Sequence, residues 1–551
     1  MAEEKKISPA NSLQKIYQIL HLDRKDISAI YMFSILAGMV QLSLPLGIQT
    51  IIGFVMAGSV STSIIILIVL VVTGTFLNGL LQVKQLSVIE KLKQKIFLRH
   101  GLEFSDRLPK LDIEKLDKYH LPELVNRFFD TISLQKGLEK LLLDLPTAII
   151  QILLGLLLLS FYHPVFIGFG IALLTIVILI IRSTSTQGLA AAMQSSDEKY
   201  KTVAWLQETA RLVNSFKYSN GAYHINRTDK LIGNHLEART SYFKILLVQF
   251  WSLITFKIII TASMLIVGTV LLVDQQINVG QFIAADIVII TIIGSVEKLI
   301  VSLDKIYDAM VSVEKLGKIT EAVKETSGMM KLPNSNKGVA IEFRNIRYAY
   351  PDGAKILDNI NCRVAPGQWL QVSGQSGSGK STVLKLLTGS YKNFEGMLLI
   401  DGQPISSYSL ESLRPLTGIL LSSQDIFQGT LWENITIGNQ LVSVGEVTEY
   451  ANKIGLAGFI QSAKEGVGMQ LDAMGKKLPK HIRQKILLLR SLIGKHRLLL
   501  LEEPFKYLDA IETQAIVSCL KNKQNTTVII ATDSTTLLTG CDIILSLERE
   551  I

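Results

Sequence analysis

The stretch LQVSGQSGSGKSTVLKLL, residues 370–387, joins an apolar strand pattern, a glycine-rich turn and a helix pattern. Its core matches a P-loop in the strand–loop–helix setting that this motif requires. Glycines let the backbone wrap phosphates, and the N–H groups of the loop and the helix N-terminus face their negative charge. Lys380 is expected to reach the β- and γ-phosphates, and the Ser381 hydroxyl to bind Mg²⁺. We therefore predict an ATP site with Mg²⁺ at Gly374, Gln375, Ser376, Gly377, Ser378, Gly379, Lys380, Ser381 and Thr382.

Downstream of the P-loop, LLLLEEP (498–504) has the form of a buried strand that ends in two carboxylates. The long interval between Lys380 and this strand leaves room for a helical subdomain. Strand and helix patterns alternate after a segment rich in Gly, Ser, Asn and Pro, which is typical of an α/β domain. The predicted organisation is a membrane domain at 1–325, a linker at 326–339 and an α/β ATP-binding domain at 340–551.

The residues before the linker are much more apolar than those after it. The whole chain is 48% hydrophobic, its mean hydropathy is +0.35, and the apolar runs are concentrated in residues 25–300. A helix needs about 20 apolar residues to cross a bilayer. Six membrane-spanning helices are therefore predicted, at 28–51, 61–83, 146–162, 164–182, 250–273 and 279–300.

The connectors between these spans predict their orientation. Those after the first, third and fifth spans contain no Lys or Arg, whereas residues 84–144 contain twelve. Because basic connectors stay in the cytoplasm, both termini, the ATP-binding domain and the two long connectors are expected there. The long connectors have helical periodicity, so membrane helices should continue into the cytoplasm, with tips near 117–124 and 217–224. The net charge of +9 then reflects cytoplasmic loops and does not indicate a nucleic-acid partner.

Three residues inside the predicted spans are unusual. Pro45 is expected to kink the first helix or to act as a hinge. Lys257 and Asp286 are expected to face the bundle interior or a wet cavity, since a charge facing lipid is costly. These two residues could pair with each other, lie in a solvated position or contact a substrate, and the sequence leaves these alternatives open.

The motif order resembles a half-size ATP-binding-cassette (ABC) exporter over nearly the whole chain. IRYAYPDG (346–353) resembles the adenine-stacking loop of that family, with Tyr350 as the ring, and GILLSSQDIFQGTLWENI (418–435) resembles its glutamine loop. The resemblance implies that Gln424 lies at the Mg²⁺ and the γ-phosphate and is catalytic together with Lys380, that Glu502 binds Mg²⁺, and that Glu503 is the general base. It also implies a dimer contact for Asp509, at the end of KYLD (506–509).

Several positions depart from the family pattern. Pro479, Lys480 and His481 replace most of the Leu-Ser-Gly-Gly-Gln signature, which in the family contacts the γ-phosphate held by the other subunit. Glu502 stands where the family has the shorter Asp. Asp533 stands in the register of the switch histidine. A carboxylate there repels the γ-phosphate, and the loss of one well-placed hydrogen-bond donor costs about 10²–10³ in rate.

The resemblance therefore implies an ABC-type transport ATPase with impaired turnover. The expected function is ATP-driven export of a peptide, protein, lipid or small molecule across the bacterial inner membrane by a homodimer or heterodimer. Within the family, the plan looks most like type I secretion and peptide exporters without a peptidase domain, which can work with a membrane-fusion protein. The alternative is an ATP-binding, weakly or non-hydrolysing regulatory or structural subunit that pairs with an active half-transporter or a secretion complex.

Overall fold

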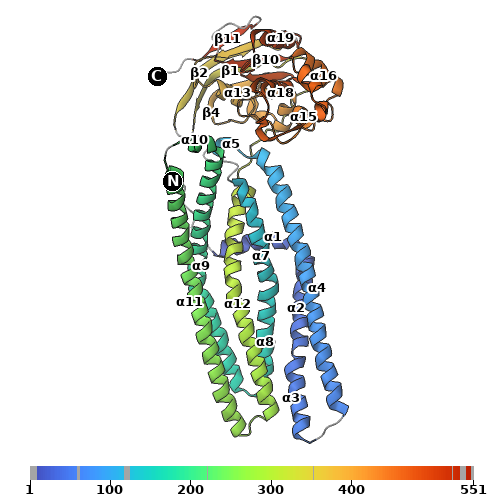
Figure 1. Ribbon diagram of the computed structural model, residues 1–551, viewed down its shortest axis with the longest axis vertical. Coiled ribbons are helices and arrows are strands. Elements are labelled where there is room, and N and C mark those ends of the chain that lie inside the picture. Colours follow the sequence, from blue (N-terminus) through green and yellow to red (C-terminus); the bar gives the residue numbers. More distant parts are fainter. Residues whose placement is uncertain are drawn as a thin grey trace. The chain divides into compact units, whose positions relative to one another are not determined.

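The computed structural model describes residues 9–58, 62–116, 124–219, 221–350, 353–523, 525–533 and 541–547. The chain forms two compact units. The first unit consists of Met1–Leu111 and Lys118–Ala322, and the second consists of Asp112–Asp117 and Val323–Ile551. Figure 1 labels the helices and strands of both units.

The first unit is built from helices, four of which are very long. These four helices contain 46, 47, 51 and 42 residues, which corresponds to about 63–77 Å at 1.5 Å per residue. The helices are α1 (Pro9–His21), α2 (Arg24–Gln41), α3 (Ser43–Met56), α4 (Thr62–Arg107), α7 (Asp130–Glu139), α8 (Leu145–Tyr162), α9 (Val165–Arg211), α10 (Val213–Lys217), α11 (Tyr223–Val273) and α12 (Val279–Thr320), with the short turns η1 (Leu108–Lys110), η2 (Asn126–Phe129) and η3 (Lys140–Asp144).

Six helical segments within the described residues are long and apolar enough to cross a membrane, which confirms the six predicted spans. The four longest helices exceed the roughly 30 Å hydrocarbon core of a bilayer about twofold. Their remaining turns form the predicted extensions. Helices α9 and α11 run side by side along these extensions (Figure 1). Helix α10 lies in the second predicted tip region, whereas residues 117–123 of the first tip lie outside the described residues.

The first predicted span is divided into two helices near Pro45. Helix α2 ends at Gln41 and α3 begins at Ser43. Proline has no N–H to donate to the carbonyl four residues earlier, here that of Gln41, so the hydrogen-bond ladder is interrupted at this point. The predicted kink is therefore present as a helix break.

Of the alternatives left open for Lys257 and Asp286, the structure does not form the pair between them; Lys257 pairs with another residue. Its Nζ atom lies 2.6 Å from Oε2 of Glu297 on α12, and the two side chains are 35% and 46% exposed. Asp286 lies about three helical turns before Glu297 on α12 and forms no hydrogen bond or ion pair in the described part of the chain. Glu297 lies near the end of the sixth predicted span, where a charge is less unusual than at the middle, so the sequence pattern does not single it out.

The second unit has the predicted α/β architecture with a helical subdomain. Its strands are β1 (Ile341–Ala349), β2 (Lys355–Val364), β3 (Trp369–Ser373), β4 (Phe394–Ile400), β5 (Gln403–Pro404), β6 (Thr417–Leu420), β7 (Gly429–Thr430), β8 (Gln470–Leu471), β9 (Leu498–Glu502), β10 (Thr527–Thr532) and β11 (Ile543–Ser546). Its helices are α5 (Ile113–Leu116), α13 (Lys380–Leu387), α14 (Leu410–Leu413), α15 (Leu431–Thr436), α16 (Val444–Lys453), α17 (Ala457–Ser462), α18 (Lys480–Leu492) and α19 (Ala510–Lys521), with the turns η4 (Ile405–Ser407), η5 (Arg414–Leu416), η6 (Gly466–Gly468) and η7 (Ala473–Gly475).

The central sheet of this unit is parallel, in the order β11-β3-β10-β9-β6. Every residue of β3, β9 and β10 is buried, as expected for parallel strands that are covered on both faces. A smaller antiparallel sheet has the order β2-β1-β4-β5. Because all the strands of the central sheet point the same way, the loops that follow them gather at one edge, where open α/β sheets bind ligands.

The segment predicted as a linker belongs to the second unit, and Arg497 is one of the residues that hold it there. Arg497 is 6% exposed. Its guanidinium donates to the carbonyl oxygens of Pro333, Lys337 and Gly338 at 3.0, 2.8 and 3.0 Å, and to Oδ2 of Asp401 at 2.8 Å. This side chain therefore holds residues 333–338 against the unit.

Replacing Arg497 with alanine should destabilise the second unit by about 3 kcal/mol, because one buried and three partly buried acceptors lose a charged donor at once. Urea unfolding of the detergent-purified chain measures this change. The control is Arg344→Ala, which removes an exposed arginine that pairs with Glu342 at 2.9 Å and should cost less than about 1 kcal/mol. Equal effects of the two substitutions would contradict the structural role of Arg497.

Candidate functional site

Four loops that follow parallel strands meet at the carboxyl edge of the central sheet. The P-loop follows β3, Ser422 lies just after β6, Glu502 and Glu503 lie at the end of β9, and Asp533 follows β10. Contacts between these residues, described below, join them into one cluster. The sheet order places β10 between β3 and β9, so side chains far apart in the sequence come together.

The P-loop has the backbone that its glycines permit. Gly377 and Gly379 have φ values of 86° and 96°, in the left-handed region. A Cβ atom on Gly379 would lie 2.8 Å from side-chain atoms of Ile356 and Leu357, so a larger residue would not fit without a shift. Gly379 also caps the N-terminus of α13, whose first residue is Lys380. The loop therefore leads directly into a helix N-terminus, which favours anions.

Lys380 is 8% exposed, and its ammonium group is held by three acceptors. Nζ donates to the carbonyl oxygens of Gly374 and Gln375 at 2.8 Å each and lies 2.6 Å from Oδ1 of Asp533. The buried hydroxyl of Ser378 in the same loop has no hydrogen-bond partner among the described residues. A carboxylate thus contacts the lysine that is predicted to bind phosphate.

Oxygen atoms gather around Glu502, which is 9% exposed. Its Oε1 accepts hydrogen bonds from the hydroxyls of Ser381 at 2.5 Å and Ser422 at 2.9 Å, and its Oε2 accepts from the backbone N–H of Ser422 at 2.7 Å. Hydroxyl and carboxylate oxygens are the ligands that Mg²⁺ prefers. The predicted metal residues Ser381 and Glu502 are therefore brought together.

The structure does not bring Gln424 to this cluster. Its Oε1 accepts a hydrogen bond from the backbone N–H of Leu421 at 3.3 Å, within its own loop. Ser422 contacts Glu502 instead. Strand pairing explains the difference: Leu420 at the end of β6 is opposite Leu501 in β9, so the residues just after Leu420 are the ones that lie beside Glu502. The register of β6 against β9 selects Ser422, and no linear motif gives that register.

Glu503 lies next to the same cluster in a left-handed backbone conformation, with φ of 44°. Its Oε1 accepts from the backbone N–H of Asp533 at 2.5 Å and its Oε2 from the Thr532 hydroxyl at 3.3 Å. Burial raises the pKa of the Glu503 carboxyl above its ordinary value, and the Asp533 carboxylate raises it further. The Asp533 N–H bond and the Thr532 hydroxyl act in the opposite direction. The carboxyl of Glu503 is therefore a stronger base than an exposed glutamate.

Tyr350 lies beside the P-loop helix. Its hydroxyl is 3.4 Å from Oγ1 of Thr382, and its ring packs edge-on against Tyr348 and Tyr391 at centroid distances of 5.4 and 6.0 Å. The aromatic residue predicted for the adenine therefore adjoins the helix that follows the phosphate loop.

The predicted signature residues lie on the surface at the start of α18. Pro479 is the N-cap of that helix, and the Lys480 ammonium lies 5.3 Å from the ring centroid of Tyr507. Asp509 caps α19 by accepting from the N–H of Glu512 at 2.7 Å. Within the described residues, no hydrogen bond or ion pair links Pro479, Lys480, His481 or Asp509 to the P-loop.

Comparisons with known proteins agree with both units. Residues 27–296 match the model of the ABC transporter transmembrane region, and residues 357–506 match that of the ABC transporter. The alpha-hemolysin translocation ATP-binding protein HlyB of Escherichia coli O157:H7 is 33% identical over 260 residues, which are 46% of this chain and 36% of that protein. Human ATP-binding cassette sub-family B member 6 is 31% identical over 41% of this chain and 27% of its own length. The chain thus matches about a third of the length of such relatives.

A solved structure supports the same fold. A bacterial Atm1-family ABC exporter with ATP bound superposes with a TM-score of 0.86, over 95% of this chain and 93% of that chain. The sequence identity is 20%, so the likeness concerns the fold. It extends over both the helical and the α/β parts of the sequence.

Proposed function

Because this chain belongs to the ABC transporter family, we propose that it is one half of a dimeric exporter that hydrolyses ATP to move a substrate across a membrane. The observation that carries the proposal is the convergence of the P-loop, Glu502 and Glu503 at one sheet edge. The same chain has six helices long enough to span a bilayer. A soluble kinase or other soluble P-loop enzyme would have no use for these helices.

The P-loop is the proposed ATP site. Residues 374–382 would surround the phosphates, Lys380 would contact the β- and γ-phosphates, and the ring of Tyr350 would stack on the adenine. The buried, unpartnered hydroxyl of Ser378 supports this assignment, because a phosphate oxygen would provide the partner that it lacks.

Ser381, Glu502 and Ser422 are the proposed protein ligands of Mg²⁺. The single carboxylate and the two hydroxyls fit a metal that is usually bound by one or two carboxylates together with phosphate oxygens and water. When bound, Mg²⁺ neutralises charge on the phosphates. Ser422 takes the role that the sequence resemblance implied for Gln424, since Ser422 is the loop residue that contacts Glu502.

Glu503 is the proposed general base, and hydrolysis is expected to be slow. Asp533 carries a negative charge beside Lys380 and cannot donate a hydrogen bond to the γ-phosphate. In the family, the switch residue serves the ATP of its own chain, whereas the signature serves the ATP of the partner. A homodimer would therefore have two doubly altered sites. A heterodimer with an unaltered partner would have two singly altered sites, which are easier to reconcile with turnover.

The membrane and partner assignments follow from the family. We place the chain in the bacterial inner membrane, with both termini and the ATP-binding domain in the cytoplasm, because the basic connectors indicate that side. Type I secretion with a membrane-fusion protein is one form of this proposal, and the resemblance to HlyB supports it. The alternative, an ATP-binding subunit that does not hydrolyse, is favoured by the Asp533–Lys380 contact.

ATP binding should depend on Lys380. In the detergent-purified chain, Lys380→Ala should weaken ATP binding at least tenfold, because a charge-assisted phosphate contact is lost. Equilibrium binding of labelled ATP measures the effect. Lys521→Ala, which removes an exposed lysine from α19, should leave the affinity unchanged. Equal affinities of the wild type and Lys380→Ala would overturn the assignment of the P-loop as the ATP site.

A further inference from the structure

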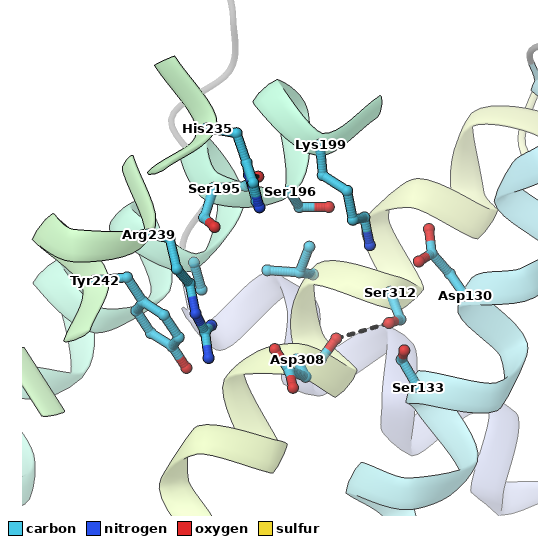
Figure 2. Close-up of a pocket in the computed structure, with 12 residues that line it drawn as sticks. Asp130, Ser133, Ser195, Ser196, Lys199, His235, Arg239, Tyr242, Asp308 and Ser312 are labelled. Atoms are coloured by element: carbon cyan, nitrogen blue, oxygen red, sulfur yellow. Dashed lines mark hydrogen bonds between the residues drawn. The ribbon is translucent and has the colours of Figure 1, made fainter. Parts of the chain in front are cut away.

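A polar cavity of about 250 Å³ lies in the first unit, whereas the P-loop belongs to the second. Its walls come from α7, α9, α11 and α12, in the extensions that continue beyond the predicted spans (Figure 2). The volume corresponds to roughly eight water molecules at about 30 Å³ each. The cavity is therefore large enough for a small organic molecule.

The charged side chains of this cavity are sorted onto two walls. Lys199 on α9 and His235 and Arg239 on α11 form one wall, and Asp130 on α7 and Asp308 on α12 form the other. Figure 2 shows the three basic side chains entering the space from the green helices, with the two carboxylates on the cyan and yellow-green helices. We call these the basic wall and the acidic wall.

The two cations of the basic wall are exposed, and the acidic wall acts on them only across the space, Asp130 on Lys199 and Asp308 on Arg239. The ammonium of Lys199 lies 5.0 Å from the ring centroid of Tyr200, and the guanidinium of Arg239 lies 5.1 Å from that of Tyr242. Apart from these ring contacts, neither cation forms a hydrogen bond or ion pair with the described residues. Nδ1 of His235 is 3.1 Å from the carbonyl oxygen of Ser195, so its Nε2 remains for a ligand.

Each carboxylate of the acidic wall uses one oxygen and keeps the other. Asp130 is 4% exposed, and its Oδ2 accepts from the Tyr200 hydroxyl at 2.6 Å. Oδ2 of Asp308 accepts from Lys305 Nζ at 3.2 Å. The Oδ1 atom of each has no hydrogen-bond partner among the described residues. The hydroxyls of Ser133 and Ser196, which line the same space, are also without partners in the described part of the chain.

We propose that this cavity binds a small zwitterion, with its carboxylate on the basic wall and its ammonium on the acidic wall. A simple anion would be repelled by the carboxylates of Asp130 and Asp308. A simple cation would be repelled by Lys199 and Arg239. Neither therefore matches the charges of both walls. A dipeptide with free termini has the required charges and a comparable size. The inference concerns binding alone and stands whether or not the chain hydrolyses ATP.

Three probes that share the glycylglycine backbone and differ in their terminal charges test this proposal on the detergent-purified full-length chain. Labelled glycylglycine should bind saturably, at one site per chain. Unlabelled N-acetylglycylglycine, which lacks the ammonium, and glycylglycinamide, which lacks the carboxylate, should each compete at least tenfold more weakly than glycylglycine itself. If glycylglycine shows no saturable binding at millimolar concentration, the proposal is refuted. That result is expected if the charges of the two walls only neutralise each other. Equal competition by all three compounds would refute the proposal as well.

Two variants connect each end of the ligand to its wall. Arg239→Gln should weaken glycylglycine binding about tenfold but leave glycylglycinamide binding unchanged. Asp308→Asn should weaken glycylglycine similarly but leave the N-acetyl compound unchanged. Lys230→Gln removes an exposed cation from the same helix as Arg239 and should change nothing. If both cavity variants keep their melting temperature and bind glycylglycine with wild-type affinity, the site is rejected. If either variant weakens the binding of all three probes equally, the proposed orientation of the ligand is rejected.

Discussion

Replacing Glu503 with glutamine should lower ATP turnover by the purified transporter about 10²–10⁴-fold, the usual contribution of a general base. The amide has the same shape as the carboxylate. Its single carbonyl oxygen can still accept from the Asp533 N–H, and its NH₂ group can donate to the Thr532 hydroxyl, but the amide cannot take a proton from water. Phosphate release measures turnover, and labelled ATP measures binding, which should be unchanged.

The control for this experiment is Glu411→Gln, which neutralises an exposed glutamate on α14 and should have no effect. If Glu503→Gln keeps the wild-type rate, Glu503 is not the base. If the wild type itself releases no phosphate, alone or with a second half-transporter, the non-hydrolysing subunit is the better description. Lys380-dependent ATP binding would remain in that case.

The pKa of Glu503 also predicts the pH dependence of turnover. Burial raises this pKa, and the Asp533 carboxylate raises it further. A base must be deprotonated to act, so turnover should increase with pH through the raised pKa and level off above it. The fall in activity on acidification should begin at a higher pH than the ordinary glutamate pKa would give.

Removing the charge of Asp533 should strengthen ATP binding. Its Oδ1 lies 2.6 Å from Lys380 Nζ. It forms an ion pair with the ammonium group that is proposed to bind phosphate, and its negative charge would repel the phosphate. Because this carboxylate is 59% exposed, screening limits the effect, and Asp533→Asn should tighten ATP binding about tenfold. Asp533→His would also supply a hydrogen-bond donor, and turnover should rise by about 10²–10³.

Both variants keep the backbone N–H that binds Glu503, so changes in turnover can be attributed to the side chain. Asp533→Asn should also move the acid limb of the pH profile to lower pH, because one of the charges that raises the pKa of Glu503 is removed. Unchanged ATP affinity and an unchanged pH profile would mean that Asp533 does not act on the nucleotide site.

Much of the architecture could be predicted from the sequence because its determinants are local. A P-loop needs its glycines, lysine and serine in consecutive order between a strand and a helix, and the structure contains β3, the loop and α13 in that order. The membrane spans depend on the length of apolar runs, and six were found where six were predicted. The helix break near Pro45 could be predicted because the missing N–H group is a property of proline itself.

The tertiary structure decided which distant side chains meet. The pairing of β6 with β9 brings Ser422 to Glu502 and leaves Gln424 within its own loop. The rotation and packing of α11 and α12 join Lys257 to Glu297 rather than to Asp286. The basic and acidic walls come from four helices that are far apart in the sequence. Strand register and helix rotation are set by packing over the whole unit, so a linear motif cannot specify them.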